Sequence, residues 1–167
     1  TPLHLRNGGH ALEVVGFVIS LHIIGMYALS PLVGWAADRF GARTVIAAGG
    51  VLLALGAGFA AGAEASDSRG VYLGLFLIGL GWCCGLVAGS ALLVRTFDGS
   101  NRVGIQGLAD LCMTASGGLA GLGSGFMVAV AGFQNLARIG VVVGLVPTVV
   151  VAIMLVSGRR DGRSQPA

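Results

Sequence analysis

The sequence predicts an all-α integral membrane protein, a helical bundle with about five transmembrane helices, and three observations predict it. Of the 167 residues, 55% are hydrophobic and only 10% are charged, whereas soluble domains carry about 25% charged residues. The mean hydropathy is +0.89, so too few polar residues remain to cover a soluble core of this size. The third observation is a series of long runs that lack charged residues almost entirely.

Five such runs define the expected helices. Each has about 20 residues or more, which is the helix length that crosses a hydrocarbon core of roughly 30 Å. The runs show no strict alternation and exceed the length of barrel strands, about 10 residues. Helices, which satisfy their own backbone hydrogen bonds in lipid, are therefore expected. The expected spans are 14–37, 44–63, 71–94, 104–131 and 139–158.

Arginine counting predicts the orientation. Short loops make consecutive helices antiparallel, so the loops alternate between the two faces of the membrane. Lys and Arg accumulate on cytoplasmic loops, so the face with more arginines, and the C-terminus with it, is expected inside a cell (plasma or inner) membrane. One face receives Arg39, Arg43, Arg95, Arg102, Arg159, Arg160 and Arg163; the other receives Arg6, Arg69 and Arg138, together with Glu64 and Asp67.

A charged stretch, GWAADRFGAR, joins the first two spans on the expected cytoplasmic face. It fills the pattern G-x-x-x-D-R-x-G-x-R with Gly34, Asp38, Arg39, Gly41 and Arg43. Gly34 lies one turn before Asp38 and would let another helix approach closely. Asp38 can accept hydrogen bonds from a neighbouring helix N-terminus or an arginine, and Gly41 permits a tight reversal.

This pattern resembles the signature loop of the major facilitator superfamily of secondary transporters. In that family the loop joins the second and third helices, and a weaker copy joins the eighth and ninth. The eighth helix and its loop in bacterial, especially actinobacterial, members are similar to VVGFVISLHIIGMYALSPLVGWAADRFGAR. The tenth and eleventh helices resemble FLIGLGWCCGLVAGSALL and RVGIQGLADLCMTASGGLAGLGSG. The resemblance implies that residues 1–167 are helices eight to twelve of twelve. Helices two to six are the alternative, because the two halves are repeats.

The resemblance also implies a function and partners. It implies transport of a small solute by alternating access, as efflux or as uptake, with the loop motif holding one conformation; the alternative for the loop is a topology signal with a tight turn. The implied partners are the lipid bilayer, a small-molecule substrate, protons as a candidate, and the N-terminal half of the same transporter, which this chain is expected to lack. The alternative function is a stand-alone membrane scaffold or partner subunit without transport.

Polar residues inside the spans form a second group of candidates, since ionisable groups at such depth usually face protein or water. Asp110 lies about two turns into the fourth span, with Gln106 on the same helical face. Two roles are expected for Asp110. It is either a proton or substrate relay or a structural partner of Arg102 or Arg43. A proton sensor or a hydrogen-bonded packing residue is expected at His22. The set of candidates for an intramembrane relay or ion pair is His22, Arg95, Arg102, Gln106 and Asp110.

Glycines recur every four residues in the third and fourth spans and predict close contacts between helices. The resemblance places the third span against the transport cavity, with Trp82 and Ser90 as candidate lining residues. The glycines concerned are Gly81, Gly85 and Gly89, and Gly117, Gly121 and Gly125.

Enzyme chemistry, metal binding and nucleic-acid binding are not expected. Cys83, Cys84 and Cys112 lie inside apolar runs without the spacing of metal ligands. The chain has no lysine, so no loop can cradle phosphate in the way of a P-loop. The arginines are scattered between spans and form no basic face. No cofactor is expected.

Overall fold

The computed structural model describes residues 12–63, 68–97 and 101–161, with side chains over 16–63, 69–97 and 101–157. Four residues of the charge count, Arg6, Glu64, Asp67 and Arg163, lie outside the described residues, as do the side chains of Arg159 and Arg160.

The described residues fold into helices joined by short links. Five segments among them are long and apolar enough to cross a membrane, so the all-helical membrane fold is confirmed. The helices are α2 (Leu12–Tyr27), α3 (Ser30–Phe40), α4 (Ala42–Gly62), α5 (Ser68–Thr96), α6 (Asn101–Ala131) and α7 (Phe133–Asp161).

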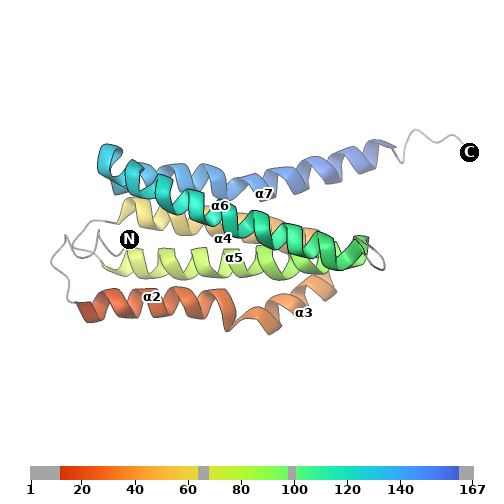
Figure 1. Ribbon diagram of the computed structural model, residues 1–167, viewed down its shortest axis with the longest axis horizontal. Coiled ribbons are helices and arrows are strands. Elements are labelled where there is room, and N and C mark those ends of the chain that lie inside the picture. Colours follow the sequence, from red (N-terminus) through yellow and green to blue (C-terminus); the bar gives the residue numbers. More distant parts are fainter. Residues whose placement is uncertain (1–11, 64–67, 98–100, 162–167) are drawn as a thin grey trace, which may run out of the picture.

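The first membrane-crossing segment consists of two helices, α2 and α3, which meet at a bend (Figure 1). Pro31 lies in the first turn of α3, where its missing N–H costs no helical hydrogen bond. Ser30 Oγ donates a hydrogen bond of 2.7 Å to the carbonyl of Tyr27, which satisfies one acceptor at the end of α2. The two helices together cover Gly16–Phe40.

The helices lie roughly side by side, with α4 and α5 in the middle of the bundle (Figure 1). The helix α5 packs against α2 and α3, and α4 packs most extensively against α5 and α7. Glycines permit these contacts: a Cβ on Gly49 would lie 2.9 Å from the carbonyl oxygen of Gly81, and a Cβ on Gly50 would lie 3.0 Å from that of Gly144. In lipid, apolar side chains gain no hydrophobic free energy by packing against another helix. Close packing of small residues therefore brings helices together.

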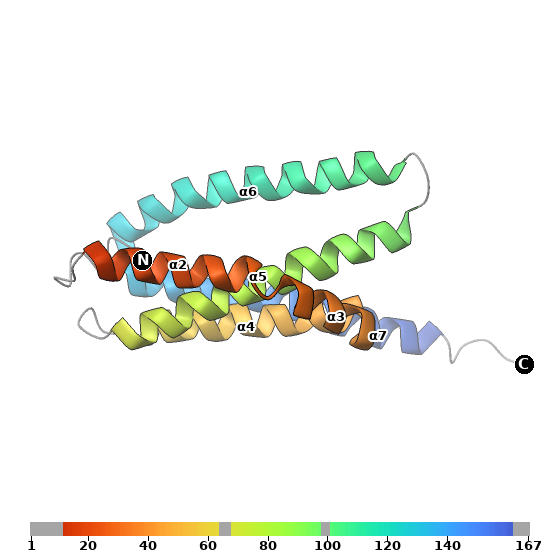
Figure 2. The same cartoon turned by 90° about the horizontal axis from the view of Figure 1, so that it is seen from below.

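The helix α6 is the exception. Figure 2 shows it running apart from the layer formed by α2, α4 and α5, and none of its described side chains is buried. The predicted contacts at its glycines are wrong for the described structure, because a Cβ on Gly117, Gly121 or Gly125 would meet no atom within 4 Å. On α5, Gly81 makes the predicted close contact, whereas Gly85 and Gly89 do not.

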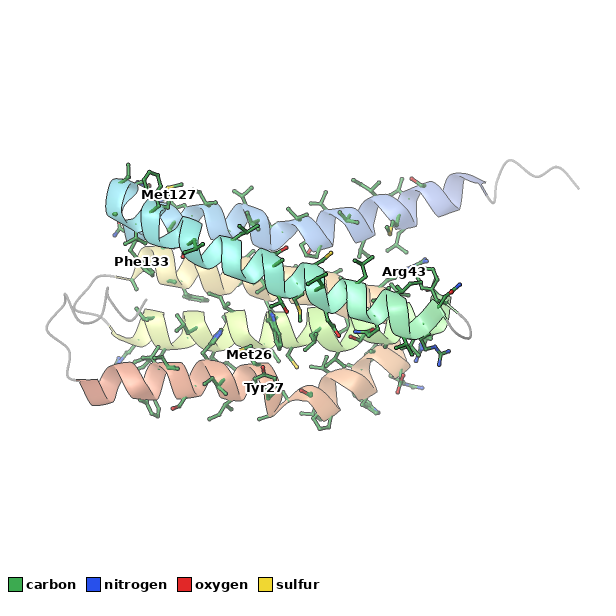
Figure 3. The ribbon with its side chains drawn as sticks, in the orientation of Figure 1. Met26, Tyr27, Arg43, Met127 and Phe133 are labelled. Carbon is green, nitrogen blue, oxygen red and sulfur yellow. The ribbon has the colours of Figure 1, made fainter. Side chains whose placement is uncertain are left out.

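The two ends of the bundle carry different residues. Arg43 lies at the end where α3 meets α4, and Met127 and Phe133 lie at the opposite end, where α6 meets α7 (Figure 3). Single residues make both of these links: Gly41 with a φ of 90° and Gly132 with a φ of 81°. Only glycine adopts such positive φ values readily.

Candidate functional site

The residues of the loop motif surround the link between α3 and α4. The backbone N–H of Gly41 donates to the carbonyl of Ala37 at 3.1 Å, and the carbonyl of Gly41 accepts from Val45 at 3.3 Å. Gly41 thus ends one helix and begins the next without any intervening loop. Arg39 and Arg43 are exposed at this end, as expected for side chains at a wet interface.

Gly34 does not make the close contact expected of it. A Cβ at this position would meet only Cγ1 of Val87, at 3.9 Å, which is ordinary van der Waals contact. The packing between α3 and α5 comes instead from the small buried residues Ala37, Cys83 and Ala88.

An ion pair ties the end of α3 to the end of α5. Nη2 of Arg95 lies 2.6 Å from Oδ1 of Asp38 and donates a hydrogen bond to it. The sequence predicted that Asp38 accepts from a helix N-terminus or an arginine, and the second alternative is found; Arg95 had been grouped instead with the residues around Asp110. Both side chains are largely exposed, at 56% for Arg95 and 71% for Asp38. Exposed pairs of this kind contribute roughly 0–1 kcal/mol to stability.

A cavity of about 330 Å³ lies between α5 and α6, with one residue of α4 in its wall. It brings together four predicted site residues that are spread over 29 positions, Trp82 and Ser90 from α5 with Gln106 and Asp110 from α6. The remaining lining residues are small or apolar: Leu53, Gly81, Gly85, Leu86, Gly89, Leu93, Ala109 and Met113.

Gln106 organises the polar side of this cavity. Its Nε2 lies 3.1 Å from Oδ1 of Asp110 and 3.5 Å from Oγ of Ser90, so the side-chain amide connects α6 to α5. Its Oε1 is buried and has no hydrogen-bond partner in the described residues. A buried acceptor without a donor is costly, so this oxygen would gain a hydrogen bond from a ligand once the Gln106 side chain turns it toward the cavity.

The other candidates for a relay lie elsewhere. Arg102 donates from Nε to the carbonyl of Phe97 at 3.4 Å, and within the described residues neither it nor Arg43 pairs with Asp110. Nδ1 of His22 lies 2.7 Å from the carbonyl oxygen of Leu75. A carbonyl only accepts, so Nδ1 carries the proton. The contact ties α2 to α5 and supports the packing interpretation of His22.

Tyr27 also belongs to the site, and the sequence analysis missed it. Its ring contacts that of Trp82 edge to face, with centroids 5.7 Å apart and planes at 69°. Tyr27 is the last residue of α2, at the bend before α3 (Figure 3). No local signal could reveal this pairing, because the two rings come from different helices that are far apart in the sequence.

Metal chemistry finds no support in the part of the chain that the structure describes, where no group of three His, Cys, Asp or Glu residues could hold a metal ion. Of the cysteines, Cys83 and Cys84 are buried and Cys112 is exposed, and all three are free thiols.

Comparison with known proteins gives consistent matches. The family model described as Major Facilitator Superfamily matches residues 2–167. Two relatives from Bacillus subtilis are the uncharacterized MFS-type transporters YddS, 40% identical over 153 residues, and YdeG, 38% identical over 152. The riboflavin transporter RfnT of Brucella anthropi is 26% identical over 135 residues. The matches cover 90%, 90% and 81% of this chain but only 35%, 35% and 33% of those relatives. No solved structure matches.

Proposed function

Because this chain belongs to the major facilitator superfamily, whose members are membrane transporters and not enzymes, we propose that it supplies helices eight to twelve of a secondary transporter. That transporter moves a small solute across the cell membrane by alternating access, with two halves rocking around a central site. The remaining helices belong to a longer protein, since the chain spans about a third of the length of its curated relatives.

The observation that carries this proposal is the cavity between α5 and α6. Asp110, an exposed carboxylate, and Gln106, a half-buried amide, lie there on a wall that is otherwise mostly apolar. Ionisable groups are costly among membrane spans and mark pathways for substrates and ions. Coupling to a proton gradient accompanies the proposal, with Asp110 as the candidate relay residue.

The second part of the proposal assigns a gating role to the Asp38–Arg95 ion pair. It joins α3 to α5, and α5 forms one wall of the cavity. Up to about 1 kcal/mol changes the ratio of two conformations about 5-fold, which is enough to bias a nearly balanced equilibrium. Gly41, as a one-residue link, obliges the end of α3 to move together with the start of α4.

The orientation in this proposal puts the Asp38–Arg95 end of the bundle, and the C-terminus, in the cytoplasm. Arg39, Arg43, Arg95 and Arg102 all lie near that end in the described structure, at the α3–α4 link and around the connection from α5 to α6. Such an excess of arginines is typical of cytoplasmic loops.

Alternating access is tested without knowledge of the solute by labelling the cavity. The full-length protein carries Ser90→Cys in a background from which Cys83, Cys84 and Cys112 have been replaced. A membrane-impermeant thiol reagent is then applied to right-side-out or to inverted vesicles. The cavity cysteine should react from both sides, because the site opens to each in turn. Reaction from one side only, or from neither, would favour the scaffold alternative.

The gating role is tested in the same vesicles. Asp38→Asn and Arg95→Gln should each shift the ratio of inside to outside labelling of the cavity cysteine by about 2- to 5-fold, the range that a pair of up to 1 kcal/mol allows. The double exchange Asp38→Arg with Arg95→Asp should restore the ratio. Arg138→Gln, at the other end of the bundle, is the matched control. An unchanged ratio in both single variants would leave the motif as a topology signal with a turn.

A further inference from the structure

Two polar groups of the α5–α6 cavity, the Gln106 Oε1 oxygen and the Asp110 carboxylate, are hydrogen-bond acceptors with unused capacity among the described residues. The Nε2 atom of the Gln106 amide has two protein acceptors, Asp110 Oδ1 at 3.1 Å and Ser90 Oγ at 3.5 Å. Gln106 Oε1, which is buried, accepts no hydrogen bond from the described residues, and only Oδ1 of the Asp110 carboxylate receives a side-chain donor there. An amide oxygen and an ionised carboxylate can only accept, so a ligand that satisfies both must donate.

The charge of the cavity is negative. Asp110 is the one ionisable carboxylate or base among the residues in its wall. Arg102 lies eight residues earlier on the same helix, about 12 Å along its axis, and donates to a carbonyl oxygen. Arg95 is held by Asp38. Among the described residues no cationic side chain pairs with Asp110, which is exposed, so its carboxylate can pair with a cation in the cavity, more strongly beside lipid than in bulk water.

An aromatic ring completes the wall. Trp82 lines the cavity, and its contact with Tyr27 restrains the position of the indole. Indole is the aromatic side chain that best attracts ammonium groups to its face. The volume of about 330 Å³ is at the lower end of the range of small-molecule sites, roughly 300–1,000 Å³.

From these features we infer that the solute bound in this cavity is a small organic ammonium ion that retains N–H protons. Asp110 accepts its N–H groups, Gln106 Oε1 accepts one once its side chain turns toward the cavity, and the face of the Trp82 indole attracts its charge. The inference rests on the proposed function of the cavity as the solute site. The inference predicts that organic anions do not bind. It also predicts that protonated amines bind more tightly than quaternary ammonium ions, which carry the charge but have no N–H donor.

A matched series of ligands tests the inference on the purified full-length protein in detergent by isothermal titration calorimetry. The series is 2-phenylethylammonium, its N,N,N-trimethyl analogue, 2-phenylethanol and phenylacetate, which share a ring and differ in charge and donors. The primary ammonium should bind about 10-fold or more tightly than the trimethyl ion, since hydrogen bonds to charged groups are the strong ones. The alcohol should bind more weakly still, and phenylacetate not at all. Equal or tighter binding of the alcohol or the anion, or no binding of any member, would overturn the inference.

Variants locate the binding. Asp110→Asn should weaken binding of 2-phenylethylammonium about 10- to 100-fold and leave binding of 2-phenylethanol unchanged. Gln106→Leu should reduce the preference for the primary over the trimethyl ion, with Gln134→Leu on α7 as the control. Trp82→Leu should weaken the binding of both cations, with Trp35→Leu as the control.

Each variant is first checked for an unchanged gel-filtration profile. Asp110→Glu should recover part of the affinity for 2-phenylethylammonium if the negative charge is what matters. Loss of affinity for the alcohol as well as the ammonium in Asp110→Asn, or an unchanged affinity for both, contradicts the inference.

The outcome is separable from that of the proposed function. Labelling of the cavity from both sides with no preference among the four ligands would defeat the ammonium inference alone. Binding in the predicted order with labelling from one side only would defeat the transport proposal and leave the ligand class standing.

Discussion

The two sides of α5 show different ways of building a helical bundle in lipid. On one side α4 approaches so closely that glycine backbones touch, as at Gly49 with Gly81 and at Gly56 with Gly74. On the other side α6 stands apart, has no buried side chain among its described residues and leaves a cavity with a few polar residues in its wall. Glycine is frequent on both sides, so glycine content alone does not define the packing. The residue opposite each glycine decides whether a contact forms.

This difference suggests a division of roles. The unit of α4, α5 and α7 is held by backbone contacts that tolerate little displacement, because a methyl group at these glycines already has no room. Few side chains of α6 contact the rest of the bundle, so it can be displaced at a lower cost. The cavity proposed as the solute site thus lies between a closely packed helix and a loosely packed one.

Gly49→Ala should have the largest effect on stability. The new Cβ would lie 2.7 Å from Cβ of Cys84 and 2.9 Å from the carbonyl oxygen of Gly81, so α4 and α5 must separate, at a cost of about 3 kcal/mol, the upper end for overpacking. The midpoint of thermal unfolding of the full-length protein in detergent should fall markedly.

The matched control is Gly121→Ala on α6, where the new Cβ meets no described atom within 4 Å. Alanine favours helix by about 1 kcal/mol over glycine, so this midpoint should stay unchanged or rise. Equal losses at the two positions would refute the contrast between the two sides of α5.

Gly41→Ala should have the second largest effect. The link between α3 and α4 requires a φ of 90° and a ψ of 139°, which an L-residue adopts only with strain, at a cost of about 1–2 kcal/mol. The same substitution at Gly34, the other glycine of the motif, has room for its Cβ and should be neutral or stabilising. Thermal unfolding and the yield of folded protein measure both. A more severe loss at Gly34 would mean that another helix approaches it closely in the complete transporter.

The sequence predicted the membrane fold well, because hydropathy over about 20 residues depends only on local composition. It also placed Trp82, Ser90, Gln106 and Asp110 among the candidate residues that now line one cavity. It failed at pairings between helices. A four-residue glycine spacing looks the same on α5 and on α6, and nothing near Arg95 shows that its partner is Asp38 on another helix. Such contacts depend on the rotation of each helix about its axis, which periodicity leaves open when a helix is apolar all round.

Thr148→Val should have the smallest effect and defines the contribution of polar contacts within the closely packed unit. Oγ1 of Thr148 donates to the carbonyl oxygen of Ala47 at 2.8 Å and so joins α7 to α4. Interhelical hydrogen bonds in membranes contribute about 0.6 kcal/mol on average, because the separated helices find other partners. Thr114→Val on α6 is the matched control, since its hydroxyl donates within its own helix to the backbone carbonyl oxygen of Asp110 at 2.8 Å. The midpoint of thermal unfolding should fall by about 1–2 °C at most in the first variant and by less in the second. If both variants lose the same stability, the Thr148 hydrogen bond between α7 and α4 adds nothing beyond what a hydroxyl within one helix contributes. The glycine contacts alone would then hold α4 to α7.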